Sequence, residues 1–153
     1  MSEITAFHIV RLTGVLIEDE KLLVLEQSIG NRKWYLPGGK PERRETIEQG
    51  IIREMWEETG LRVKFDRIIS ISDTDYINPS ALHILIMVKR VGGSIRISDN
   101  QHETTPIKNV VFIPINQIEQ YGFSHNFSIA CKNNFRDVKI YSGLDTYFDL
   151  FDT

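Results

Sequence analysis

Three glutamates near the middle of the chain have a spacing that brings side chains together on a helix. Glu54, Glu57 and Glu58 stand at i, i+3 and i+4, and helical residues so spaced are neighbours with Cβ atoms about 5–6 Å apart. A solvated helix face is one explanation. However, like charges four residues apart cost a helix roughly 0.2–0.5 kcal/mol. Glu57 and Glu58 also fall in the predicted last turn, where the helix dipole favours a cation by about 0.3–1 kcal/mol.

A divalent cation would make both arrangements favourable. Clustered carboxylate oxygens without His or Cys suit Mg²⁺, or Mn²⁺ as a substitute, rather than zinc or copper. The preceding Gly38-Gly39 pair permits close backbone approach, so that a carbonyl group there could join the cation, although a tight turn is the simpler explanation. Arg53 could hold the carboxylates through a bidentate contact, or form an ordinary surface ion pair of little energetic value. The residues therefore favour a metal site and leave the solvated face open.

The helix that carries these acids is indicated by its ends as well as its middle. Thr46 and Gln49 form a T-x-x-Q capping box at the start. Gly60 stands where a helix commonly ends in the left-handed conformation. Between them the apolar residues share one broad arc, which predicts a helix with one buried face.

The rest of the chain is rich in strand patterns, with two further helices. We predict a hairpin turn at Gly92-Gly93, a short helix around 116–120 after Pro114, and a second major helix over Ser124–Phe135. The predicted strands cover Phe7–Ile17, Lys21–Leu25, Leu61–Ile71, Leu82–Val91, Ser94–Ser98 and Val110–Ile113. Strands joined mostly by hairpins with a few helices predict an α/β fold of the α+β type, with a mixed sheet between helical layers.

Composition limits the kind of protein this is. Its 153 residues suit one domain, which we expect to span 1–153. The 18 Lys and Arg against 21 Asp and Glu give a net charge of −3, which argues against a DNA-binding surface. The single cysteine, Cys131, is expected to be a buried apolar residue. The start resembles no signal peptide and no apolar run would cross a membrane, so we expect a cytoplasmic protein without a membrane partner.

The residues around the three glutamates resemble a known signature. Gly39, Glu45 and the run Arg53-Glu54-Met55-Trp56-Glu57-Glu58-Thr59-Gly60-Leu61 resemble the Nudix box at every defined position. The box covers the 23 residues from Gly39 to Leu61. The preceding Trp34-Tyr35-Leu36-Pro37-Gly38 segment is similar to the family as well.

The resemblance implies a fold, an activity and a set of site residues. Nudix proteins are typically α/β/α sandwiches that hydrolyse a nucleoside diphosphate linked to another moiety. Carried over by position, Glu54, Glu57 and Glu58 would bind Mg²⁺, with the carbonyl group of Gly39 as a further ligand. Glu45 would be a more distant acid, and Arg53 would orient the glutamates. The general base would be Glu54 or an acid of a later loop such as Glu103, which is equally well explained as a surface residue.

Substrate contacts are less well defined by the sequence. Trp34 and Tyr35 could stack on a base, or belong to the core. Arg11 could contact phosphate, although single basic residues are more often solvated. Tyr76 falls in the window after the box that often bears on substrate in this family. His83, in an apolar strand, is expected to be a satisfied core histidine.

Three functions compete for this sequence. The first is a Mg²⁺-dependent hydrolase of nucleotide pyrophosphates, acting on a nucleoside triphosphate or an ADP-ribose-like nucleotide sugar. The second is a catalytically weak Nudix domain that binds a nucleotide as a sensor, which the intact acidic set disfavours. The third, hydrolysis at RNA 5′ ends, is disfavoured because no basic stripe is present.

The last fourteen residues form an aromatic and acidic tail. Residues 140–153 contain three Asp and no Lys or Arg, and so account for the whole net charge. Their apolar members, Tyr141, Leu144, Tyr147, Phe148 and Phe151, are too many for a free terminus. We expect the tail to dock on the domain or on a second subunit, which would make a homodimer.

Overall fold

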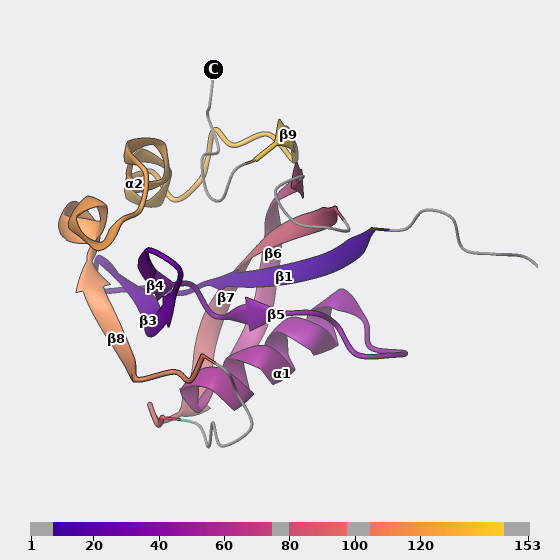
Figure 1. Ribbon diagram of the computed structural model, residues 1–153, viewed down its shortest axis with the longest axis horizontal. Coiled ribbons are helices and arrows are strands. Elements are labelled where there is room, and N and C mark those ends of the chain that lie inside the picture. Colours follow the sequence, from indigo (N-terminus) through magenta and orange to yellow (C-terminus); the bar gives the residue numbers. More distant parts are fainter. Residues whose placement is uncertain (1–7, 75–79, 98–104, 146–153) are drawn as a thin grey trace, which may run out of the picture.

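The computed structural model describes residues 8–74, 80–97 and 105–145 (Figure 1). Its helices are α1 (Ile47–Thr59), the 3₁₀ helix η1 (Ile115–Tyr121) and α2 (His125–Lys132). Its strands are β1 (Ile9–Val15), β2 (Ile17–Glu18), β3 (Lys21–Ile29), β4 (Arg32–Tyr35), β5 (Gly38–Gly39), β6 (Leu61–Thr74), β7 (Ala81–Gly93), β8 (Asn109–Pro114) and β9 (Tyr141–Leu144).

The strands form two sheets. The larger has the order β5-β1-β7-β6-β9 and is mixed, because β1 pairs in parallel with β7 and β6 with β9, whereas the other pairs are antiparallel. The smaller contains β2, β3 and β4, with β8 paired to β3. The predicted mixed sheet with helices is confirmed, and its strands are divided between two sheets.

Helices on opposite sides of the strands explain why the central strand β7 is apolar from Ile84 to Val88. Along β7, Ile84 and Ile86 belong to the hydrophobic cluster that includes Met55 of α1. The alternate residues Leu85 and Met87 belong to the cluster that includes Phe127 of α2. Successive strand residues point to opposite faces, so β7 is buried on both. Figure 1 shows α1 and α2 on the two sides of these strands.

The ends of α1 match their sequence signals. Thr46 accepts a hydrogen bond from the backbone N–H of Gln49, and the Gln49 side chain accepts one from the backbone N–H of Thr46. Gly60 has a φ of 79° and donates its N–H to the carbonyl group of Trp56. Both caps satisfy helix-end groups that the helix itself cannot pair, and they fix which residues lie on the helix.

The predicted hairpin at Gly92-Gly93 is wrong. Gly93 remains in β7, opposite Leu61, and has a φ of 78°. Of the strand predicted over Ser94–Ser98, residues 94–97 are described and form no strand, because they pass over the end of α1, where the N–H of Arg96 donates to the carbonyl group of Thr59. The conformational freedom of Gly93 serves this close passage over Gly60 rather than a chain reversal.

The remaining differences concern element ends. The helix predicted over Ser124–Phe135 ends at Lys132, because Asn134 and Phe135 have left-handed φ values of 59° and 56°. The helix predicted around 116–120 is the 3₁₀ helix η1. Cys131 is buried, as predicted.

The tail begins as an edge strand. Residues Tyr141–Leu144 form β9 beside β6, and the Tyr141 hydroxyl lies 2.5 Å from Oδ2 of Asp73. Tyr147, Phe148 and Phe151 lie outside the described residues. Within the described residues, no helix is both long enough and apolar enough to cross a membrane.

Candidate active site

Two glycines bring the backbone against α1. Gly38 and Gly39 form β5, which pairs with Leu12 and Thr13 of β1. A Cβ atom on Gly39 would lie 2.5 Å from Oε1 of Glu54, which is far inside normal contact. A side chain at position 39 would therefore displace the Glu54 carboxylate. The expected close approach of the Gly38-Gly39 backbone to the acids is confirmed.

Arg53 is the centre of the acidic cluster. Its Nε and Nη2 donate to the two carboxylate oxygens of Glu45 at 2.6 and 3.0 Å, a bidentate contact. Its Nη1 donates to Glu54 at 3.0 Å and to Glu57 at 3.1 Å. These bonds lower the pKa of Glu45 and raise that of Arg53. Arg53 is partly buried, so this is more than a surface ion pair.

Glu58 is held separately, by the backbone of the glycine pair. Its Oε1 accepts a hydrogen bond of 2.7 Å from the N–H of Gly38. Burial, together with the charges of Glu54 and Glu57, raises the pKa of Glu58 to about 8, against the opposing effects of the Gly38 hydrogen bond and of Arg11. Burial also raises the pKa of Glu54, against the opposing effect of Arg53. The site thus concentrates more carboxyl groups than its single arginine neutralises.

The donor set fits a hard cation, although the acids are not arranged around one. Among the described residues, no three His, Cys, Asp or Glu side chains form a ready-made metal cluster. Glu54 and Glu57 turn toward Arg53, and Glu58 turns toward Gly38. Glu58, a partly exposed carboxyl group kept protonated mainly by desolvation, is the group that a bound Mg²⁺ would ionise, and carboxylate oxygens are the ligands Mg²⁺ prefers. Binding would require rotation of these flexible side chains.

Arg11, opposite His83 in the β1-β7 register, acts electrostatically on the acidic cluster and on His83. It is exposed on β1, and its charge lowers the pKa of both Glu58 and His83. Arg11 is therefore electrostatically coupled to the acids, whereas Tyr76 and Glu103 lie outside the described residues.

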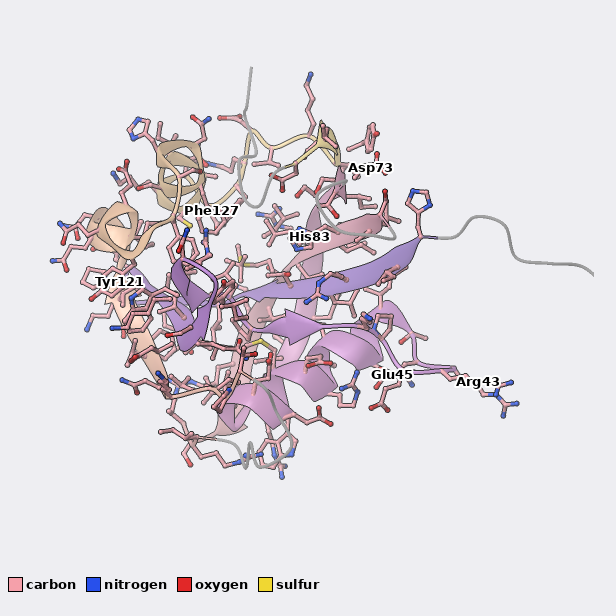
Figure 2. The ribbon with its side chains drawn as sticks, viewed as in Figure 1. Arg43, Glu45, Asp73, His83, Tyr121 and Phe127 are labelled. Atoms are coloured by element: carbon pink, nitrogen blue, oxygen red, sulfur yellow. The ribbon has the colours of Figure 1, made fainter. Side chains whose placement is uncertain are left out.

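Trp34 and Tyr35 lie in a different region. The Trp34 ring contacts Tyr121 edge-to-face at 5.1 Å, beside a pocket of about 580 Å³ between the β3-β4 hairpin and η1. The hydroxyl of Tyr35 donates to the carbonyl group of Ile29 at 3.0 Å, and burial raises its pKa. No described contact joins either ring to the acids, and Figure 2 shows Tyr121 far from Glu45.

The hydrogen bonds of His83 with Thr13 and of Ser72 with Asp145 were not predicted from the sequence. His83 is buried as predicted, with Nε2 2.6 Å from the Thr13 hydroxyl, and burial lowers its pKa to about 4. Ser72, opposite His83 on β6, donates to the buried carboxylate of Asp145 at 3.4 Å. The signal available was the alternation of Ser70, Ser72 and Thr74, which places hydroxyl groups at every second residue.

Replacing Glu58 with Gln should flatten the pH dependence of stability when no metal ion is present. The folded protein retains a proton on Glu58 that the unfolded chain releases, so wild-type stability falls as the pH rises from about 4.5 to about 8. The slope is at most about 1.4 kcal/mol per pH unit. Urea unfolding in a chelating buffer at several pH values measures it. The exposed Glu48→Gln change is the control, and equal slopes for Glu58→Gln and the wild type would contradict the burial effect.

Known proteins similar to this chain share one family. The NUDIX domain model matches residues 8–130. A MutT-like protein of Streptomyces ambofaciens is 41% identical over 64 residues, which cover 42% of this chain and 42% of that protein. An ADP-ribose pyrophosphatase of Methanocaldococcus jannaschii is 27% identical over 120 residues, 76% of this chain and 68% of that protein. The crystal structure of a UDP-X diphosphatase superimposes with a TM-score of 0.67 at 22% identity, over 94% of this chain and 70% of that chain.

Proposed function

The chain belongs to the Nudix family, and from this membership we propose that it is a Mg²⁺-dependent pyrophosphohydrolase of nucleotides. It would cleave the pyrophosphate bond of a nucleoside diphosphate linked to another moiety, in the cytoplasm. The observation that carries the proposal is the acidic cluster beneath the glycine pair. Glu54 and Glu57 share one arginine, and Glu58 stays protonated beside them.

Each residue of the cluster has a role in the proposal. Glu54, Glu57, Glu58 and the carbonyl group of Gly39 would hold the cation. Bound Mg²⁺ supplies neutralisation of phosphate charge and a more acidic water molecule. Arg53, anchored by its two bonds to Glu45, would keep Glu54 and Glu57 oriented when substrate arrives. Glu58 would give up its proton on cation binding.

The general base is proposed to be Glu54, with Glu103 as the alternative. The raised pKa of Glu54 makes its carboxylate a stronger base than an exposed glutamate. Its contact with Arg53 keeps it oriented. Glu103 precedes β8 in the sequence and lies outside the described residues.

The substrate class is proposed from the name of a relative and from the positively charged side chain of Arg11. The M. jannaschii relative carries the name ADP-ribose pyrophosphatase, which supports an ADP-ribose-like nucleotide sugar, with a nucleoside triphosphate as the other member of the class. Arg11, exposed beside Glu58, is suited to a phosphate group. Trp34 and Tyr35, beside the pocket between the β3-β4 hairpin and η1, are proposed to stack on the base of the substrate.

One observation favours a second candidate function. Because no described trio of acids forms a ready-made metal cluster, the domain could bind a nucleotide as a sensor with little turnover. A panel of nucleoside triphosphates and nucleotide sugars separates the two functions. With Mg²⁺ we expect release of a nucleoside monophosphate, and chelation should abolish it. Tight binding with no turnover of any compound would support the sensor.

Replacing Glu57 with Gln should lower turnover by about a hundredfold on the best substrate of the panel. The substitution keeps the shape of the side chain but removes a charge that the cation requires, and one principal catalytic contribution has this scale. Steady-state rates at saturating Mg²⁺ measure the effect. Glu48→Gln, on the first turn of the same helix, should leave the rate unchanged. A wild-type rate in Glu57→Gln would remove Glu57 from the ligand set.

A methyl group at position 39 should affect activity more than stability. In Gly39→Ala the new Cβ atom meets the end of a flexible side chain, the Glu54 carboxylate, which can move at little cost to folding. Displacing a catalytic group by about 1 Å can cost a hundredfold in rate. We expect a comparable loss of turnover with a small change in the unfolding midpoint. Gly92→Ala, whose Cβ atom would be 4.0 Å from the nearest atoms, is the control. Full activity in Gly39→Ala would show that Glu54 is not needed in its present position.

A further inference from the structure

A surface patch of apolar and basic side chains lies where α1 and β7 end. Its apolar members are exposed: Trp56 by 40%, Val91 by 61%, Ile95 by 42% and Ile97 by 55%. Arg62 and Arg96, also exposed, complete it. We call these six residues the Trp56 patch. None of them is among the site residues discussed above.

The Trp56 patch is built on a fixed backbone. The guanidinium groups of Arg62 and Arg96 lie 5.3 and 4.8 Å from the centre of the Trp56 ring. Arg96 donates its backbone N–H to the carbonyl group of Thr59 at 3.0 Å and its Nη2 to that of Trp56 at 3.1 Å. These bonds hold residues around Arg96 against the helix end, so that the patch has a defined shape before any partner arrives.

Local stabilisation explains only part of this arrangement. α1 has no basic residue in its last turn, and the two arginines place positive charge near its negative end. Yet within the described part of the chain no salt bridge involves Arg62 or Arg96. Val91, Ile95 and Ile97 are exposed hydrophobic side chains. An apolar surface whose arginines pair with no acid of the described residues fits a partner segment that is both hydrophobic and acidic.

The chain contains a segment of this chemistry. Residues 146–153 read Thr-Tyr-Phe-Asp-Leu-Phe-Asp-Thr, with four large apolar residues, two aspartates and no lysine or arginine. The aromatic and aliphatic side chains match the exposed apolar members of the patch, and Asp149 and Asp152 match its arginines. The segment follows Asp145, whose N–H donates to the carbonyl group of Asp73 on β6.

Length decides which copy of the patch the segment can reach. Eight residues span at most about 29 Å when fully extended. Arg62 and Asp73 are eleven residues apart along β6, about 35 Å at strand spacing. Figure 1 likewise shows β9 and the end of α1 at opposite ends of the molecule. The patch of the same chain is therefore out of reach.

We propose that residues 146–153 of one copy bind the Trp56 patch of a second copy, and that two such contacts related by a two-fold axis form a homodimer. A two-fold arrangement uses both segments and both patches, and so leaves none exposed. The contact combines apolar burial with four Asp–Arg attractions, two on each side.

Light scattering on the full chain over a range of concentrations tests the proposal. We expect a concentration-dependent dimer that high salt weakens. Asp149→Lys with Asp152→Lys should raise the dissociation constant at least about tenfold, as should Arg62→Glu with Arg96→Glu. Combining all four substitutions should restore association, because the charges are exchanged. Lys108→Glu with Lys132→Glu, an equal charge change on exposed residues elsewhere, is the matched control.

A peptide titration keeps the proposal testable if the patch variant fails to fold. A synthetic peptide of residues 146–153, added to the Asp149→Lys, Asp152→Lys chain, should shift the indole N–H signal of Trp56 and leave that of Trp34 in place. The same peptide with both aspartates changed to Asn should bind more weakly. A wild-type chain that stays monomeric at every concentration would overturn the proposal. So would a dimer indifferent to the tail charges, or a peptide that does not shift Trp56.

Discussion

The balance of charge around Arg53 is the constraint on which the site depends. Glu45, Glu54 and Glu57 all bond to this one guanidinium, and Glu58 lies beside them without it. Arg53 and the exposed Arg11 do not neutralise four carboxylates, and burial raises the pKa of Glu58 to about 8, so that it stays protonated at neutral pH. The folded domain therefore holds more carboxyl groups at this site than its positive charges neutralise. A divalent cation would neutralise this excess negative charge and would also bind the substrate phosphates, which is the physical basis for the proposed activity.

The fold maintains this unfavourable cluster by packing on both sides of it. α1 is fastened to the sheet by an apolar face whose members Ile51 and Met55 are fully buried. The strand pair β1-β5 then holds the glycine backbone against the acidic face of the same helix. Because the helix cannot shift without opening its core, the carboxylates stay concentrated in spite of their repulsion.

Charge is also unevenly distributed at the scale of the whole chain. In the sequence, the acidic and aromatic residues 146–153 follow β9, which pairs with the Ile71–Asp73 end of β6, while Arg62 lies at the other end of β6. The length of β6 therefore separates β9 from Arg62 within one molecule. Separation of complementary charges at opposite ends favours association between molecules over contact within one.

Local patterns in the sequence were sufficient to determine α1, its caps, the acids it presents and the family, because those signals act over a few residues. Strand positions were predictable from apolar runs, but the role of Gly93 was not, since it depends on the distant Gly60. Tertiary structure alone decided that Glu45 would bind Arg53 at two points, that Glu58 would accept a hydrogen bond from Gly38, and that Trp34 would pack on Tyr121. These are contacts between residues far apart in the chain or set by burial, and burial is a property of the assembled layers rather than of any segment.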